Sequence, residues 1–438
     1  MSKTLIQGAL IVTMNDEKPG HFYGDILTNN DQIENISEKP DSVKPELADR
    51  VIDGSNLIVM PGFINTHGHA AMSLLRSYAD DMPLTDWLVK KIWPIETLLE
   101  SDDIYWGSML SIAEMIKGGT TTFTDMYFFM DRVAEAAAES GIRAVLSRGL
   151  SLFGLGIDEG GFKETKKFIN DWHGAENGRI TVMLGPHAIY TGSPDFYRSI
   201  VDLAGETGLS LQIHLSETKI EVESSFEQHG CSPVKLLYDL GLFDHKVLAA
   251  HCVHLSKQDI ELLAEKNVGV SHNPGSNLKL GSGIAPVRKM LEAGITVGIG
   301  TDGASSNNNL DMVEEMRLAA LLGKGLEMDP TLINAVTALQ MSTSMGAEAL
   351  SLGKVGVLRE GYKADLIGFR HDRPHLTPMH DPQSHLVYAS AAADVCLVMV
   401  DGKLLLENGE LTTLDEEKIR AEASRKATRL VNAGKDNH

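Results

Sequence analysis

An alternation of strand-like and helix-like segments fills the middle of the chain and restricts what it can fold into. Eight of these segments are short, apolar and rich in β-branched residues, which is typical of strands covered on both faces. The predicted strands span residues 62–66, 120–126, 142–147, 180–186, 209–214, 247–251, 268–272 and 296–301. The predicted helices between them span residues 102–117, 130–140, 161–173, 195–207, 233–240, 256–266 and 287–293.

This alternation predicts an α/β fold of the TIM type, in which strand–helix units close into a (β/α)8 barrel. A doubly wound open sheet is the rival fold. It would place a glycine-rich phosphate-binding turn after its first strand, and no such turn follows residue 66. Barrel enzymes carry their chemistry at the C-terminal ends of the strands, so we expect the functional residues there.

Short predicted strands also stand at both ends of the chain, too short and too polar to form a core alone. They span residues 5–13, 25–28, 32–36, 50–53 and 57–60 at one end, and 357–369 (a turn and then a strand), 394–400 and 403–407 at the other. We expect the two ends to meet in one small β-sandwich; two independent ribbons are the alternative. A capping box at residues 413–416 predicts a surface helix over 416–431. The expected domains are therefore residues 1–59 with 357–438, and the barrel at 60–356.

Composition and charge restrict the partners and the compartment. The 438 residues are 43% apolar and 23% charged, as in a soluble globular protein, and the formal net charge is −21. An acidic surface repels phosphate, so we expect no nucleic-acid partner and no anionic membrane partner. No apolar run reaches the ~18 residues of a membrane helix, and no signal peptide is recognised. Three scattered cysteines, Cys231, Cys252 and Cys396, predict no disulfide framework and favour a cytoplasmic protein.

Histidines and acidic residues stand at the ends of the predicted barrel strands. Residues 58–66 read as a buried strand that ends at His67 and His69, and alternation along a strand turns both side chains the same way. The later strands end at His187, at His214 followed by Glu217, at His251, at His272 and at Asp302. A single histidine is more often a core or surface group, but histidines at five of eight strand ends, with an aspartate at the eighth, indicate a metal site.

Three histidines and one aspartate suit a borderline divalent ion such as Zn²⁺, with one position open for water. Iron and manganese remain open alternatives for the same donors. A bound ion lowers the pKa of water from 15.7 to about 7 and so provides hydroxide at neutral pH. His251 and Asp302 are candidate proton acceptors beside it, and Glu217 is a candidate donor of a proton to the substrate.

Several longer motifs carry a family resemblance. They are Pro-Gly-Phe-Ile-Asn-Thr-His-Gly-His at 61–69, Gly-Gly-Thr-Thr-Thr-Phe-Thr-Asp-Met at 118–126, His-Leu-Ser-Glu-Thr at 214–218, and the long stretches at 271–287 and 300–312. With these motifs the chain resembles the amidohydrolase superfamily and, within it, the 5-methylthioadenosine/S-adenosylhomocysteine deaminases, over nearly its whole length. The stretch at 271–287 together with His-Leu-Ser-Glu is typical of the deaminase and chlorohydrolase branch.

The resemblance implies roles for individual residues on a mononuclear zinc barrel. The implied ligands of one Zn²⁺ per subunit are His67, His69, His214 and Asp302, and the implied catalytic residues are Glu217, His251 and Asp302. The implied substrate contacts are Trp87, Glu96 at the ribose hydroxyls, Arg148 toward the 5′-substituent, His187, Glu217 and Asp302. Surface charge is the alternative interpretation of Glu96 and Arg148.

The resemblance implies hydrolytic deamination of the 6-amino group of adenine nucleosides to the inosine analogue and ammonia. 5′-Methylthioadenosine, S-adenosylhomocysteine and adenosine are left unranked as substrates, and a homo-oligomer is one open assembly state. A guanine or triazine aminohydrolase, or a chlorohydrolase on the same scaffold, remains an alternative. A two-metal cyclic amidase is disfavoured because residues 180–187 lack the bridging lysine, and a non-catalytic structural relative is disfavoured because every ligand is present.

Overall fold

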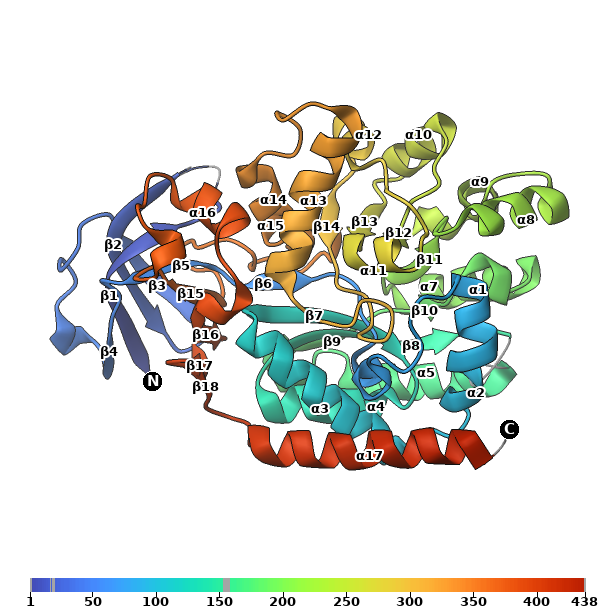
Figure 1. The fold of residues 1–438 in the computed structure, drawn as a ribbon, viewed down its shortest axis with the longest axis horizontal. Helices are drawn as coiled ribbons and strands as arrows, with labels where there is room; N and C mark the ends of the chain where they lie inside the picture. Colours follow the sequence, from blue (N-terminus) through green and yellow to red (C-terminus); the bar gives the residue numbers. More distant parts are fainter. Residues whose placement is uncertain (1, 16, 18–19, 153–157, 437–438) are drawn as a thin grey trace.

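A closed parallel sheet surrounded by helices forms the larger part of the computed structural model, which describes residues 2–15, 17, 20–152 and 158–436 (Figure 1). Its strands are β6 (Phe63–Asn65), β7 (Thr120–Tyr127), β8 (Arg143–Leu150), β9 (Ile180–Val182), β10 (Gly185–Pro186), β11 (Leu211–Leu215), β12 (Val247–His251), β13 (Gly269–His272) and β14 (Val297–Ile299). The sheet runs β10-β8-β7-β6-β14-β13-β12-β11, with β9 paired to β8. Parallel bridges from Leu184 to Leu211 and from Ala188 to His214 close the circle. The predicted barrel is confirmed, and its fourth strand is divided into β9 and β10.

The seven predicted helices are all present, with ends that differ by at most three residues. They are α3 (Ser101–Lys117), α4 (Met130–Ser140), α5 (Asp158–Trp172), α7 (Pro194–Thr207), α9 (Pro233–Asp239), α10 (Lys257–Glu265) and α12 (Val287–Glu292). Helices absent from the prediction include α8 (Lys219–His229), α11 (Pro274–Lys279), α13 (Met312–Glu327), α14 (Ala335–Met341), α15 (Ser344–Ala349) and α16 (Pro382–Tyr388). Helix α8 buries only Glu221 and Ser225, so it lacks the apolar periodicity on which such a prediction depends.

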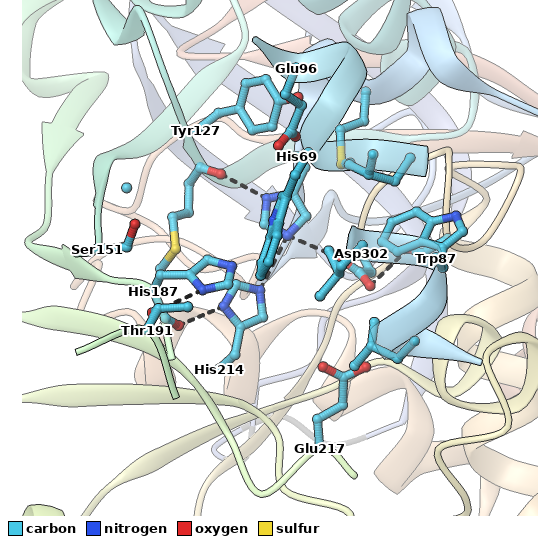
Figure 2. Close-up of a pocket in the computed structure, with 18 of the residues that line it drawn as sticks. His69, Trp87, Glu96, Tyr127, Ser151, His187, Thr191, His214, Glu217 and Asp302 are labelled. Carbon is cyan, nitrogen blue, oxygen red and sulfur yellow. Dashed lines mark hydrogen bonds and ion pairs between the residues drawn. The ribbon is translucent and has the colours of Figure 1, made fainter. Parts of the chain in front are cut away.

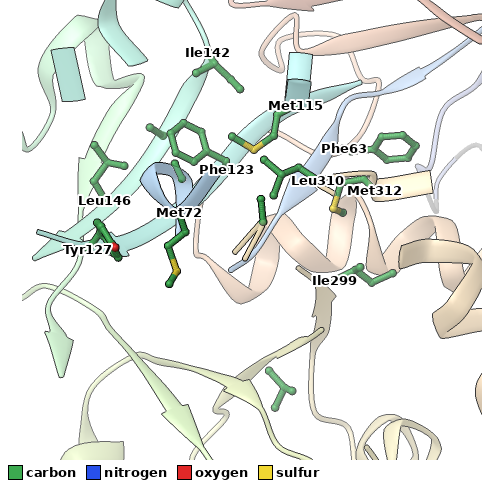
Figure 3. Close-up of a cluster of buried hydrophobic side chains, with 14 of the residues drawn as sticks. Phe63, Met72, Met115, Phe123, Tyr127, Ile142, Leu146, Ile299, Leu310 and Met312 are labelled. Carbon is green, nitrogen blue, oxygen red and sulfur yellow. The ribbon is translucent and has the colours of Figure 1, made fainter. Parts of the chain in front are cut away.

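Apolar side chains between the barrel strands and the outer helices hold the two layers together. Phe123 of β7 packs in one cluster with Met115 of α3 and with Ile142 and Leu146 around β8 (Figure 3). Each of these side chains is almost fully buried, and burial of such a side chain stabilises the fold by about 1.5–3 kcal/mol. This packing fixes the strands whose C-terminal ends carry the polar residues.

The two ends of the chain meet in a second sheet, as predicted. Its strands are β1 (Lys3–Val12), β2 (His21–Asn29), β3 (Gln32–Ser37), β4 (Arg50–Asp53), β5 (Leu57–Pro61), β15 (Leu366–Arg370), β16 (Val395–Val400), β17 (Lys403–Glu407) and β18 (Glu410–Leu411). One continuous path, β18-β17-β16-β15-β5-β1-β2-β3, with β4 beside β1, joins N-terminal and C-terminal strands through the pair β5–β15. The sheet folds over a small core that includes Ile11, Val59 and Leu397. Strand β3, the last on this path, is also bonded to the segment before β15, since Ile33 N donates to Tyr362 O.

The segment at 58–66 belongs to two strands, which agrees with the separate predicted strands at 57–60 and 62–66 and corrects the interpretation of 58–66 as one strand. The chain leaves the terminal sheet after β5 and enters the barrel at β6, and Gly62 lies at the change. A Cβ atom on Gly62 would lie 2.1 Å from the side chain of Thr121, so only glycine fits this close approach.

The C-terminal helix α17 (Glu416–Asp436) begins differently from the prediction. Asp415 Oδ1 accepts the hydrogen bond from Lys418 N, whereas the hydroxyl of Thr413 donates to Ser140 O, so the predicted capping box is wrong. One face of α17 is buried, through Ile419 and other apolar residues, and the helix runs beside α3 along the lower edge of Figure 1. Among the described residues, no helix is both long and apolar enough to cross a membrane.

A buried arginine joins the barrel to the terminal sheet. Arg143, at the start of β8, donates to Asp365 Oδ2 over 2.8 Å and also binds Asp401 in the turn between β16 and β17. The Arg143 side chain is 5% exposed and that of Asp365 is 3% exposed. Loss of the guanidinium would leave the buried Asp365 carboxylate without a countercharge, whereas Asp401 would keep its ion pair with Lys363.

We therefore expect Arg143→Ala to lower the free energy of unfolding by about 3–5 kcal/mol, the typical cost of removing one partner of a buried ion pair. Urea titration followed by circular dichroism measures this change. The control is Arg370→Ala, which breaks the solvent-exposed pair with Asp372 and should leave stability nearly unchanged. Equal effects of the two substitutions would contradict a joining role for Arg143.

Candidate active site

A cavity opens at the C-terminal ends of the barrel strands, where the sequence predicts functional residues. Its polar part includes His69, His187, His214, Glu217, His251 and Asp302. Figure 2 shows the rings of His69, His187 and His214 turned toward one another, with Asp302 beside His69. Aromatic and aliphatic side chains line much of the rest of the cavity and form an apolar wall, among them Trp87, Leu88, Ile92, Trp93 and Phe128. The cavity therefore combines a polar floor with an apolar wall suited to a flat ring.

The predicted ligand residues lie close enough together to hold one ion. His67 Nε2 and His69 Nε2 lie 3.6 and 3.2 Å from Asp302 Oδ1, and His69 Nε2 lies 3.3 Å from His214 Nε2. Two sets of donor atoms lie within 4.8 Å of one another: His67 with His69 and Asp302, and His67 with His214 and His251. Imidazole nitrogens with one carboxylate oxygen are the donors that Zn²⁺ prefers.

His67 shows that these donors fit a metal ion. Its side chain is fully buried, and neither ring nitrogen has a hydrogen-bond partner among the residues that the structure describes. Burial, followed by the charge on His69, holds the pKa of His67 well below its usual value, so the ring is neutral. An unpaired buried polar atom costs about 1–3 kcal/mol. A divalent cation that accepts the lone pair of Nε2 would remove this cost.

His69 and Asp302 concentrate charge at the same point. Burial opposes protonation of His69, but the hydrogen bond and negative charge of Asp302 raise its pKa to about 9. Burial likewise opposes ionisation of Asp302, but His69 holds the pKa of this carboxyl well below its ordinary value. The site thus carries a buried carboxylate whose charge a cation must balance, and a divalent ion can take the place of the proton.

Neighbouring groups fix the orientation of the ligand side chains. His69 Nδ1 lies 2.7 Å from Met126 O, and His214 Nδ1 lies 2.8 Å from His187 O. A carbonyl only accepts hydrogen bonds, so each Nδ1 carries a hydrogen and each Nε2 faces the site. The Nε2 of neutral His214 offers its lone pair, and the Nε2 of His69 would do so once a cation replaces its proton. The hydroxyls of Ser276 and Ser306 donate to Asp302 Oδ2 over 2.6 and 2.8 Å, which leaves Oδ1 facing the histidines.

Glu217 and His251 lie side by side at the cavity. His251 Nε2 is 3.8 Å from Glu217 Oε2, and His251 Nδ1 is 2.8 Å from Asn277 Oδ1. Burial raises the pKa of Glu217, which favours its protonated form. The backbone is left-handed at His251 (φ 74°) and Asp302 (φ 60°), a conformation that costs a non-glycine residue about 1–3 kcal/mol and is enriched at functional sites.

A π-helical turn brings the apolar wall and Glu96 onto the same face. The wall consists of α1 (Leu84–Trp87), the π turn η3 (Leu88–Ile92) and α2 (Trp93–Glu96), and Trp93 N donates to Leu88 O five residues earlier. In an uninterrupted α-helix, Trp87 and Glu96 would lie about half a turn apart, on opposite faces. The extra residue in the π turn rotates Glu96 back toward the cavity. Pro94 favours this irregularity because it has no N–H for a regular helical bond.

Glu96, Trp87 and His187 all line the cavity, as expected for substrate contacts. Glu96 is buried and accepts a hydrogen bond from the hydroxyl of Tyr127 over 2.6 Å, and burial raises its pKa. Trp87 donates from Nε1 to Ala79 O over 3.0 Å. Burial lowers the pKa of His187 to about 4, so this ring is neutral.

Arg148 and His272 differ from the other predicted residues. Arg148 is buried, but it is not among the described cavity residues; it donates to Glu164 Oε2 over 2.9 Å and lies 5.2 Å from the ring of Phe128. Its predicted contact with a 5′-substituent remains a prediction. His272 is buried at the end of β13 and belongs to neither set of candidate metal donors among the described residues.

The sequence analysis assigned no role to Tyr127, Asn277, Ser276 or Ser306, which support the predicted residues. Three of them lie inside the motifs at 271–287 and 300–312. The signal was therefore present, but their partners are distant in sequence. Only the folded chain shows which carboxylate or imidazole each one contacts.

Comparisons with known proteins agree with this geometry. Residues 58–405 match the sequence model of the amidohydrolase family. The chain is 51% identical over 440 residues to a 5-methylthioadenosine/S-adenosylhomocysteine deaminase from Pelotomaculum thermopropionicum, with 99% of this chain and 100% of that relative covered.

Two solved structures extend the comparison to bound metal. An adenosine deaminase from Xanthomonas campestris, crystallised with bound zinc, is similar with a TM-score of 0.93 and 32% identity, over 98% of this chain and 99% of that one. The atrazine chlorohydrolase of Arthrobacter aurescens, in complex with zinc, has a TM-score of 0.89 and 27% identity, over 97% of this chain and 100% of that one.

We expect His67→Asn to weaken binding of a divalent ion by more than about 100-fold, because loss of a ligand should exceed the 10- to 100-fold cost of losing an outer partner. Elemental analysis after dialysis against known metal concentrations measures the effect. His272→Asn is the matched control, since it removes a buried histidine at the end of another barrel strand, β13. Full metal binding by the His67 variant would contradict the site.

Proposed function

The chain belongs to the amidohydrolase family and, within it, groups with the 5-methylthioadenosine/S-adenosylhomocysteine deaminases, and from this premise we propose that it deaminates adenine nucleosides. In the proposed reaction, water adds to C6 of the adenine ring, a ring nitrogen takes up a proton, and ammonia leaves C6. The product is the 6-oxo purine nucleoside. The observation that carries the proposal is the cavity that places Glu217 and His251 beside three candidate metal donors, His69, His214 and Asp302.

We propose that His67, His69, His214 and Asp302 hold one Zn²⁺. Such an ion would supply Lewis acidity that lowers the pKa of water to about 7. The ligand geometry and the unpaired nitrogens of His67 support this set, and zinc in two solved relatives supports the choice of metal. Iron and manganese remain alternatives because imidazole and carboxylate donors accept them too.

Glu217 is the proposed donor of the proton to the adenine ring. Its side chain is buried at the cavity, and burial raises its pKa, so a protonated carboxyl is available at higher pH than on the protein surface. The Ser282 hydroxyl donates to Oε1 over 3.3 Å, which leaves Oε2 on the side of His251. A positioned acid of this kind contributes about 10²- to 10⁴-fold to the rate.

His251 and Asp302 are the proposed carriers of the proton taken from water. His251 Nδ1 lies 2.8 Å from Asn277 Oδ1, so the ring turns Nε2 toward Glu217 and the cavity, where it is proposed to accept a proton. Asp302 is held ionised, and Ser276 and Ser306 occupy its Oδ2, so Oδ1 remains to pass a proton to the departing amine. Neither residue needs an organic cofactor for this transfer.

Binding of the nucleoside is assigned to cavity residues other than the proposed proton carriers. The Glu96 carboxylate is proposed to accept hydrogen bonds from the ribose hydroxyls, and Trp87 and His187 to contact the rest of the substrate. Figure 2 shows Glu96 and Glu217 at opposite ends of the group, which suits a substrate whose sugar and base need separate partners. Arg148 is proposed as a contact for a charged 5′-substituent, which would require release of Glu164.

The remaining finer assignments are also proposals. The two sheets support two domains, with boundaries near residues 59 and 357 as the sequence predicts. The three cysteines Cys231, Cys252 and Cys396 are free thiols in the structure, which supports a reducing cytoplasmic location.

A triazine hydrolase is the second candidate function, because a triazine hydrolase from the solved structures has a TM-score of 0.90 and 27% identity to this chain. Its substrate has no ribose. The buried Glu96, paired with Tyr127 and directed into the cavity, favours a substrate with hydroxyl groups.

The direct test measures ammonia release from 5′-methylthioadenosine, S-adenosylhomocysteine, adenosine and guanine, and chloride release from a chlorinated triazine. We expect release from the adenine nucleosides, with a shift of the ultraviolet spectrum from a 6-amino to a 6-oxo purine. Glu96→Gln should raise KM for nucleosides because the amide keeps only one oxygen acceptor. Turnover of the triazine alone would replace the proposed function with the second candidate.

Removal of the metal gives an independent test. We expect a chelator to abolish turnover and stoichiometric Zn²⁺ to restore it, because a bound ion would lower the pKa of the attacking water to about 7. Circular dichroism should show that the chelated protein stays folded. Undiminished turnover by protein shown to be free of metal would rule out this chemistry.

A further inference from the structure

A second buried glutamate lies behind the proposed acid. Glu221 is the third residue of α8, a helix of 11 residues that starts after Thr218, and its side chain is 5% exposed. Glu221 Oε1 accepts the hydrogen bond from Ser216 N over 2.9 Å, and Oε2 accepts that from Glu217 N over 2.8 Å. The Glu221 carboxylate thus accepts hydrogen bonds from the backbone amides of two consecutive residues, Ser216 and Glu217.

This arrangement departs from an ordinary helix cap. Thr218 and Glu221 have the spacing of a capping box, and Thr218 Oγ1 accepts the hydrogen bond from Glu221 N over 3.2 Å. In a regular box the carboxylate would return to the backbone N–H of Thr218. Here it reaches past that residue to Ser216 and Glu217, so capping of α8 alone does not explain its position.

Helix α10 shows the regular arrangement in the same chain. Asp259, also the third residue of its helix and 4% exposed, accepts hydrogen bonds from the backbone N and the hydroxyl of Ser256, its own capping residue. Both carboxylates are buried and both bind backbone amides. Only Glu221 binds the amide of a residue at the cavity, so Asp259 is a matched reference for the capping role.

The loop held by Glu221 is strained and points two functional side chains inward. Ser216 has a left-handed backbone (φ 50°), which costs a non-glycine residue about 1–3 kcal/mol. Ser216 O accepts hydrogen bonds from Val253 N and His254 N, over 3.1 and 2.9 Å, so the turn is held from both sides. His214 before it and Glu217 after it both line the cavity. Release of one side would let Glu217 leave its position.

We propose that Glu221 is a positioning residue that fixes the backbone of Ser216 and Glu217, and thereby aims the Glu217 carboxyl at the substrate ring. This inference rests on the proposed function of Glu217. Glu221 is not among the described cavity residues, so its effect on turnover passes through Glu217.

The test begins with Glu221→Gln in the zinc-loaded full-length protein. The amide keeps the size of the side chain but offers only one acceptor oxygen and turns N–H groups toward a backbone N–H. We expect kcat to fall about 10- to 100-fold, part of the contribution of a positioned acid, while KM changes less than about threefold. Both Glu221→Gln and Asp259→Asn should lower the melting temperature, and to a similar extent. Asp259→Asn should leave kcat unchanged. An unchanged kcat in Glu221→Gln, or an equal loss of kcat in both variants, overturns the proposal.

A double substitution tests whether the effect passes through Glu217. If it does, Glu217→Gln combined with Glu221→Gln loses no more kcat than Glu217→Gln alone. Losses that multiply would overturn the positioning role.

Hydrogen exchange gives a readout that does not depend on turnover. In Glu221→Gln, the peptide covering residues 211–222 should exchange faster than in the unsubstituted protein, and faster than in Asp259→Asn. Unchanged exchange overturns the proposal even if the deaminase assignment holds. Absence of ammonia release by the unsubstituted protein, by contrast, refutes the proposed function, while exchange still decides whether Glu221 holds the loop.

Discussion

The buried Asp302 carboxylate, shared by His67 and His69, is the interaction around which the cavity is arranged. An ionised carboxylate in a protein interior is unfavourable unless a positive charge balances it. The nearby nitrogens of His67 and His214 belong to neutral rings, since burial lowers both pKa values, so they offer lone pairs and no charge. Donors of this kind around one negative charge are what a divalent cation requires.

The fold of the barrel brings those donors together. His67, His214, His251 and Asp302 come from four strands that are not all neighbours in sequence, and closure of the sheet places their ends on one rim. Residues outside the cavity then fix individual atoms: Asn277 orients His251, and Ser276 orients Asp302. The backbone is left-handed, and therefore strained, at Ser216, His251 and Asp302, all in or next to the cavity.

The sequence predicts the barrel well because its strands are buried on both faces. Strand β12 has the predicted bounds, and histidines at the strand ends identify the cavity because parallel strands all end on one side. Prediction fails where local pattern and fold differ. Helix α8 carries no apolar stripe, so its periodicity does not identify it as a helix. The roles of Glu221 and Tyr127 depend on partners that no spacing rule identifies. The hydrogen bond from Arg148 to Glu164 is likewise visible only in the folded chain.

X-ray absorption at the edge of the bound metal can identify the proposed ligands, because it reports the atoms around the ion without reference to turnover. The account predicts a single ion per chain with nitrogen and oxygen neighbours at about 2.0–2.2 Å and the outer-shell scattering of several imidazole rings. A shell of oxygen alone, without imidazole scattering, or sulfur neighbours at about 2.3 Å, would contradict it.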